Sequence, residues 1–225
     1  MDAEEIHDPK IKEVANRVFS KAGIQNVKVY QTESNDFNGL ATGMNIGRAM
    51  VTLTTATMKM PLEHIEGILA HEAVHVKKRD VLLGQLLRIP YILFVIGLVL
   101  YFQQSGINLE EYLVPIFFVV WFLMLLFPVY QSFYMQWMEV RADHYGSQFL
   151  GGGKRQMAES LKSLGAHQDI ATKKMMEYRF TDEEREGYQS ILVRGSWFIR
   201  FLEFQFLPHP PMYWRVQSLE DDNVG

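Results

Sequence analysis

Two long apolar runs, joined by a short polar segment, dominate the pattern of hydrophobic and polar positions along the chain. The first run extends from Val81 to Phe102 with Gln85 and Arg88 as polar interruptions, and the second extends from Leu113 to Tyr130 without a charge. Each run has about the 20 residues that a helix needs to cross a bilayer. Because the core helices of soluble proteins are rarely apolar on every face, the pattern predicts a two-helix membrane hairpin, with a buried helical hairpin as the alternative.

Shorter patterns before the hairpin predict a soluble part of mixed structure. In DPKIKEVANRVFSKAG, Asp8 and Pro9 mark a helix start and Gly23 marks its end. NVKVYQTE alternates and RAMVTLTTATM is rich in β-branched residues, so both predict strands, with SNDFNGLATG as a turn between them. Pro61 begins a helix whose apolar stripe continues into the segment HEAVH.

An aromatic stretch near the C-terminus, ILVRGSWFIRFLEFQFLP, has two interpretations. Its arginines, Arg194 and Arg200, lie among Trp197, Phe198 and Phe201, a mixture that suits a helix at a membrane interface. The same apolar residues also suit a core helix, and this is the interpretation that we favour.

Basic residues flank the predicted hairpin. Residues 77–79 and Arg88 lie before it or at its start, and Arg141 follows it, whereas its loop contains Glu110 and Glu111 and no Lys or Arg. The positive-inside rule then predicts a multi-pass protein integral to the cytoplasmic membrane, with the loop outside and both soluble parts in the cytosol. The lipid bilayer is therefore an expected partner.

Composition and charge exclude several classes of protein. The 225 residues have a net charge of −4 and a pI of about 6.0, which provides no basic field for nucleic acid. Because the chain has no cysteine, it forms no disulfide, and a bound metal ion would need histidine and carboxylate ligands. The composition does not indicate an oligomeric state.

The segment HEAVH places two histidines four residues apart. On a helix, His71 and His75 lie on one face and can present two imidazoles to one zinc ion, while Glu72 points beside them. Zinc lowers the pKa of a bound water toward about 7, and a neighbouring carboxylate can accept its proton as the water attacks a carbonyl. An ordinary polar helix face is the alternative interpretation of these residues taken alone.

A catalytic zinc ion also needs a third protein ligand and an open position. The segment MEVRADHYG, shortly after the second apolar run, contains Glu139 and Asp143 four residues apart. One carboxylate can reach the metal while the other supports a ligand histidine through its second ring nitrogen, and spacing alone allows either assignment. A mixed-charge surface is the alternative, but a hairpin returns this segment to the side of the membrane where His71 lies.

The order of these segments resembles the HtpX-type membrane zinc metallopeptidases, which belong to the gluzincin group and are related to the CAAX prenyl proteases. The resemblance is carried by ILAHEAVHVKKRD, the two apolar runs and MEVRADHYG. NGLATG resembles the family's loop before the strand that lines the site, and MAESLKSL resembles its helix after the third ligand. HPPMYWRVQSL resembles the family's His-Pro signature, so the match covers most of the chain.

The resemblance implies a role for each residue of the candidate metal site. It implies one zinc ion per chain, held by His71, His75 and Glu139. It further implies that Glu72 is the general base and that Asp143 supports a ligand from the second shell of residues.

Further roles are implied for residues outside the two motifs. His209 and Arg215 would be catalytic residues close to the site, where one of them could stabilise an oxyanion. Substrate would bind in extended form by main-chain pairing with a strand of the site. The substrate-binding residues would be Asn38, Met50, Val51, Thr52, Leu53 and Thr54.

The expected fold class is α+β and mostly helical, with a zincin-like catalytic domain, a small strand region and an inserted transmembrane hairpin. Residues 1–80 would contain the metal-binding helix, residues 81–130 the hairpin, and residues 131–225 the third ligand. The expected activity is endopeptidase hydrolysis of polypeptide substrates, and the resemblance implies misfolded and membrane proteins as substrates in quality control. HtpX-type proteins carry two further spans before the soluble N-terminal part, and this sequence contains no counterpart of them.

Three alternatives stay open at this point. A CAAX prenyl protease would share the zinc site but has more spans, and a regulatory sensor peptidase would share the mechanism but needs a receptor domain. A catalytically silent membrane scaffold would keep the fold without the metal. The zinc content of the purified protein distinguishes an enzyme from such a scaffold.

Overall fold

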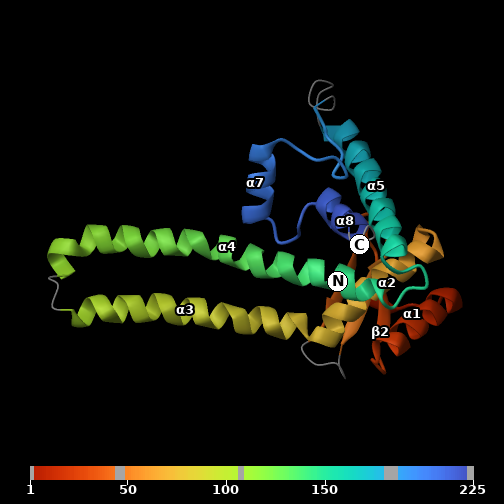
Figure 1. Cartoon of the computed structure of the whole chain (residues 1–225), viewed down its shortest axis with the longest axis horizontal. Helices are drawn as coiled ribbons and strands as arrows, with labels where there is room; N and C mark the ends of the chain where they lie inside the picture. The colour runs from red at the N-terminus through yellow and green to blue at the C-terminus, as the bar shows by residue number, and fades with distance from the viewer. Residues whose placement is uncertain (1–2, 44–48, 106–108, 180–186, 222–225) are drawn as a thin grey trace.

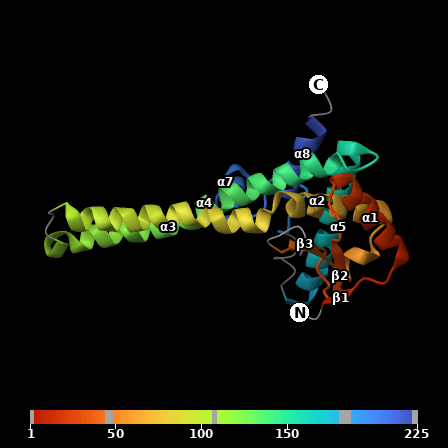
Figure 2. The same ribbon diagram turned by 90° about the horizontal axis from the view of Figure 1, so that it is seen from below.

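A small sheet, a cluster of helices and a long helical hairpin make up the molecule (Figure 1). The computed structural model of the chain describes residues 3–43, 49–105, 109–179 and 187–221. The far end of the hairpin projects beyond the sheet and the other helices in both views (Figures 1 and 2). The fold is therefore mostly helical with a minor strand component, as the sequence predicts.

The first helix follows the signals predicted for it. Helix α1 (Pro9–Ala22) begins after Asp8, whose side chain accepts a hydrogen bond of 2.8 Å from the backbone N–H of Lys10. It ends at Gly23, which takes a left-handed φ of 71° that a residue without a Cβ adopts easily. The predicted start and end of this helix are confirmed.

The strands form one four-stranded sheet in the order β1-β2-β4-β3. Strands β2 (Lys28–Thr32) and β4 (Met50–Thr54) are parallel neighbours and confirm the two predicted strands. Strand β1 (Ala3–Glu5) is not predicted by the sequence, because its three exposed residues show no apolar alternation. Strand β3 (Gly39–Thr42) lies in the segment predicted as a turn, so that prediction is wrong for these four residues.

The position of β4 corrects the prediction for substrate binding. β4 pairs with β2 on one side and with β3 on the other, so its main-chain groups already take part in two ladders. Val51 and Leu53 of β4 are fully buried. The predicted substrate strand, Met50–Thr54, is therefore an internal strand that cannot pair with a peptide, and β3 is the edge strand on that side of the described sheet.

Helix α2 (Leu62–Lys78) is the central helix of the molecule and carries the HEAVH segment. It begins after Pro61, as predicted, and packs against α1, α4 (Leu109–Ser147), α5 (Gly153–Arg179) and β3. Gly67 allows α5 to approach closely, because a Cβ at that position would overlap the side chain of Ser160. Packing on several sides buries most of α2, including Glu72, which is only 6% exposed.

A single residue separates α2 from helix α3 (Asp80–Gln104). Arg79 takes a left-handed φ of 55°, and its backbone N–H donates to the carbonyls of His75 and Val76, which ends α2. Residues with a Cβ seldom adopt this conformation, because the Cβ crowds the following carbonyl oxygen. The chain therefore changes direction shortly after the HEAVH segment, and Asp80 opens a new helix.

Helices α3 and α4 (Leu109–Ser147) form the predicted hairpin (Figure 2). Both are long and apolar enough to cross a membrane, and no part of the most apolar window of either is buried. Side chains such as Phe118 and Phe122 are 58% exposed, which does not agree with the buried-hairpin alternative. The helices extend beyond the predicted boundaries at 81 and 130, because α3 begins at Asp80 and α4 continues to Ser147.

Helix α7 (Trp197–Phe206) contradicts the core assignment that we favoured from the sequence. None of its residues is buried, and the exposed fraction of Trp197 is 73%. The helix packs beside α4 and is followed by helix α8 (Met212–Asp221), in which Arg215, Val216 and Leu219 are buried. Aromatic content alone did not distinguish a core helix from an exposed apolar one.

The left-handed turn at Arg79 generates a stability prediction. Arg79→Gly should change the free energy of unfolding by less than about 1 kcal/mol, because glycine tolerates the conformation but makes the unfolded chain more flexible. Arg79→Val should lower it by about 1 to 2 kcal/mol relative to Arg79→Gly, since a β-branched residue opposes a positive φ. Both variants remove the same exposed charge, so thermal unfolding of the pair isolates the backbone effect. Equal stability of the two variants would contradict this account.

Candidate metal centre

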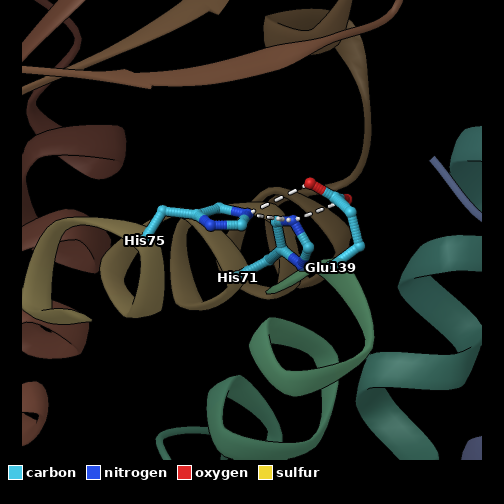
Figure 3. A group of neighbouring side chains, drawn as sticks. All are labelled: His71, His75 and Glu139. Carbon is cyan, nitrogen blue, oxygen red and sulfur yellow. Dashed lines mark hydrogen bonds and ion pairs between the residues drawn. The ribbon is translucent and has the colours of Figure 1, made fainter. Parts of the chain in front are cut away.

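Two histidines of α2 and one glutamate of α4 point toward one another (Figure 3). The Nε2 atoms of His71 and His75 are 3.0 Å apart, and each lies 3.4 Å from an oxygen of Glu139. The helical spacing of four residues puts both imidazoles on one face of α2. The structure thus brings together the three residues that were proposed as zinc ligands, although they come from two helices.

The second ring nitrogen of each histidine is bound by a carboxylate. Nδ1 of His71 lies 2.8 Å from Oδ1 of Asp143, one turn after Glu139 on α4, and Nδ1 of His75 lies 2.7 Å from Oδ2 of Asp80. A carboxylate at Nδ1 favours the tautomer in which Nδ1 carries the proton and Nε2 is free to bind a metal. Both free nitrogens therefore face Glu139.

Asp80 is a site residue that sequence reasoning missed. It follows His75 by five residues, which in a continuous helix would place it about 140° away around the axis. The left-handed turn at Arg79 returns it to His75. Its other oxygen pairs with Arg141 of α4, whose guanidinium lies 4.5 Å from the ring centre of Trp137. The sequence signal for Asp80 was its position as a single acidic residue between the basic residues 77–79 and the apolar run that begins at Val81.

Arg215 of α8 completes the support of His71. Its guanidinium donates two hydrogen bonds of 2.7 Å to the two oxygens of Asp143, and Nη1 lies 3.4 Å from Glu139. Asp143 is fully buried and Arg215 is 7% exposed, so each charge depends on the other for compensation. The structure places Arg215 beside the ligands, as the resemblance implied, but with its guanidinium bound to Asp143.

For Glu139 and for His75, burial changes the pKa in one direction and hydrogen bonding changes it in the other. Burial by itself raises the pKa of Glu139, but hydrogen bonds from His209 and from the two ligand histidines hold this pKa well below its ordinary value. Burial by itself lowers the pKa of His75, but hydrogen bonds with Asp80 and Glu139 raise it to about 10. A metal ion must therefore displace a proton from this imidazole, so metal affinity should rise with pH through the neutral range.

The three residues fit the requirements of a zinc ion. Ligands about 2.0 to 2.2 Å from a tetrahedral zinc ion would lie about 3.3 to 3.6 Å from one another, and the separations here, 3.0 to 3.4 Å, are close to that range. Imidazole and carboxylate are both zinc ligands, and the Nδ1 partners supply the outer support that such sites use. Three protein ligands leave one position for water or substrate, as in catalytic zinc sites.

The ligands line a cleft with a volume of about 1710 Å³. Glu72 lines the same cleft, and a Cβ on Gly39 would lie 3.3 Å from its Oε1, so β3 passes close to this carboxylate. Asn38, predicted to bind substrate, also lines the cleft. His209 lies there too, with Nδ1 3.1 Å from Glu139 and a side chain that is 62% exposed.

Two histidines and a glutamate around one point, with a further glutamate beside them in a cleft, are typical of a metallopeptidase. The family model described as Peptidase family M48 matches residues 5–223, so the chain belongs to that family. Protease HtpX of Mannheimia succiniciproducens is 28% identical over 210 residues, which cover 89% of this chain and 68% of the relative. The Protease HtpX homolog of Desulfatibacillum aliphaticivorans is 30% identical over 217 residues, covering 92% of this chain and 66% of the relative.

These relatives confirm the HtpX-type resemblance found in the sequence. The similarity is higher over a shorter part of the chain in another relative, the Protease HtpX homolog of Pelotomaculum thermopropionicum, which is 36% identical over 77 residues. Those residues cover 34% of this chain and 27% of the relative. The chain spans about two thirds of the length of the two relatives that match it over most of its residues.

Substitution of the carboxylate proposed to bind the metal should have a larger effect than substitution of the carboxylates that bind the ligand histidines. Glu139→Gln should lose most of its zinc under mild chelation, because it removes a ligand. Asp143→Asn and Asp80→Asn should retain zinc with an affinity about 10- to 100-fold lower, because they weaken only the support of a ligand histidine. Competition with a chromophoric chelator measures these affinities.

Glu63→Gln is the matched control for this series, because Glu63 is an exposed carboxylate on α2 and should leave zinc affinity unchanged. Retention of zinc by Glu139→Gln together with its loss from Asp143→Asn would mean that the ligand and its support are reversed.

Proposed function

We propose that this protein is a zinc endopeptidase embedded in the membrane, with His71, His75 and Glu139 as metal ligands and Glu72 as general base. The observation that carries the proposal is the convergence of the three ligand side chains within 4.8 Å, with both Nδ1 atoms bound by carboxylates. A metal site supported in this way from two sides suits a function that needs fixed ligand geometry. A catalytically silent scaffold would not need a fixed ligand geometry.

The bound metal and the side chains of the protein would contribute different parts of the hydrolysis. A bound zinc ion would polarise the scissile carbonyl and lower the pKa of the attacking water. Glu72 would accept a proton from that water and deliver it to the amide nitrogen of the leaving group. Its position on the HEAVH helix, beside both ligand histidines and under the edge of β3, supports this role.

His209 and Arg215 would act in different ways. His209 is half-exposed at the cleft and within hydrogen-bond distance of Glu139, so we assign to it the stabilisation of negative charge on the substrate oxygen. Arg215 is buried and bound to Asp143 through both carboxylate oxygens. We therefore assign to Arg215 the positioning of Asp143, and through it of His71.

The edge strand β3 is the proposed binding site for an extended peptide. β3 borders the cleft and pairs only with β4 among the described strands, and Leu40 on it is 55% exposed. Pairing with a strand edge uses main-chain hydrogen bonds and therefore imposes little sequence preference. Such tolerance would suit polypeptide substrates of many sequences, including misfolded and membrane proteins removed in quality control.

The proposed location is the cytoplasmic membrane, with the hairpin α3–α4 inserted and the metal centre in the cytosol. Support comes from the length, apolar composition and exposure of the two helices. The charges agree with this orientation, because residues 77–79 and Arg141 lie at the base of the hairpin, near the metal centre.

The general base gives the most direct test of the mechanism. Glu72→Gln should keep one zinc ion per chain while casein hydrolysis falls by about 100- to 10,000-fold, since the proton acceptor is lost and the ligands remain. Glu63→Gln should retain the wild-type rate. Hydrolysis at the wild-type rate by Glu72→Gln would sink the mechanism, and absence of zinc from the wild type after supplementation would favour the scaffold.

The orientation is tested by labelling single cysteines in a chain that has none of its own. Ser105→Cys, at the exposed end of α3, should react with an impermeant thiol reagent applied outside intact cells. Arg155→Cys, on an exposed position of α5, should react only after the cells are opened. The reverse pattern of labelling would place the metal centre outside the cytosol.

A further inference from the structure

Helix α7 turns its charged residues toward the protein and its apolar residues outward, whereas an ordinary surface helix does the opposite. Residues follow one another at about 100° around a helix, which puts Arg200 and Glu203 on one side of α7. These two residues are half-buried, and each has a buried side-chain atom without a hydrogen-bond partner, namely Arg200 Nε and Glu203 Oε2. The opposite side includes the half-buried Gln205 and is otherwise formed by exposed apolar residues: Trp197 (73%), Phe198 (55%), Phe201 (55%), Leu202 (39%) and Phe206 (54%).

The polar side of α7 faces the catalytic domain. Glu203 lines the cleft of the candidate metal site, and Arg200 lines a smaller pocket together with Trp214 of α8. Phe204 packs edge-on against Trp214, with ring centres 5.6 Å apart. The exposed aromatic side therefore points away from the domain, which is unfavourable in water and favourable in an apolar medium.

The position of α7 relative to the hairpin indicates which medium covers that side. Gln136 of α4 donates hydrogen bonds to the carbonyls of Glu203, Phe204 and Leu207 at the C-terminal end of α7. Gln136 lies six residues after Tyr130, where the second apolar run ends, which is about 9 Å along the helix axis. A headgroup region is about 5 to 7.5 Å thick on each side of the hydrocarbon core, so α7 is attached within a few ångströms of the outer limit of the headgroups.

Two further observations support an interfacial position. Helix α7 runs across the direction of α3 and α4 and lies on the side of the domain from which the hairpin projects (Figure 1). On α4, the residues on either side of the attachment point include Phe133 and Trp137, which are 76% and 53% exposed. Aromatic residues at this level are typical of the boundary between lipid and water.

We propose that α7 is an interfacial helix that lies on the cytosolic surface of the same membrane that the hairpin crosses. Its aromatic side enters the boundary between headgroups and acyl chains, while Arg200 and Glu203 remain on the protein side. This inference rests on the proposed insertion of the hairpin. Because Ile199 and Glu203 of α7 line the cleft of the candidate metal site, the helix would hold this cleft next to the bilayer, where a segment of a membrane protein can reach it.

Spin labels on single cysteines in the full-length chain, reconstituted in liposomes that contain anionic lipid, test the proposal. Molecular oxygen concentrates in the bilayer, whereas a water-soluble nickel chelate stays in the aqueous phase. Each reagent speeds the relaxation of a spin label that it can reach. Labels at Phe201 and at Trp197 should respond more strongly to oxygen than to nickel. Phe122 in the hairpin provides the bilayer reference, and Arg155 on α5 provides the aqueous reference. Circular dichroism of each labelled protein verifies that it is folded.

The outcomes separate the two proposals. An oxygen-dominated response at Phe122 and at both α7 positions supports the interfacial helix. A nickel-dominated response at both α7 positions, with Phe122 still in the bilayer, would overturn the interfacial helix and leave the hairpin intact. Shielding of both α7 positions from both reagents would overturn it in favour of a covering protein or a second copy of the chain. A nickel-dominated response at Phe122 would overturn the hairpin, and the interfacial helix with it.

Discussion

The buried ion pair between Asp143 and Arg215 is the interaction on which the metal centre depends. Both charges are buried, and each is compensated chiefly by the other through two hydrogen bonds of 2.7 Å. The pair fixes α8 against α4, and the contact of Asp143 with His71 fixes α4 against α2. Glu139 lies one turn before Asp143, so the same contacts set its distance to both imidazoles.

A second set of contacts connects the metal centre to the hairpin. The first residue of α3 is Asp80, which binds His75, and α4 carries both Glu139 and Asp143 near its C-terminal end. The ion pair between Asp80 and Arg141 joins the two hairpin helices at that level. Displacement of either helix would therefore change the position of a ligand or of its supporting carboxylate. The candidate metal site and the hairpin therefore share the contacts of Asp80 with His75 and with Arg141.

The distribution of apolar side chains divides the molecule into two environments. Around α2 they are buried against the sheet and the neighbouring helices, and the charged residues of the site lie inside this packed region. On α3, α4 and α7 the apolar side chains are exposed, and on α7 the polar residues Arg200 and Glu203 point inward instead. The proposed medium, a bilayer with its interface, would account for the exposure of all three helices.

The sequence by itself determined α1, the hairpin and the pairing of His71 with His75, because these depend on periodicities within one helix. It left open whether Glu139 or Asp143 meets the metal, and it indicated neither Asp80 as the partner of His75 nor β3 as the edge strand. Those features depend on the left-handed residue at Arg79, on strand order, and on a contact between residues 72 positions apart in the chain. Only tertiary packing decides such contacts, because local periodicity specifies which face a residue occupies but not what lies against that face.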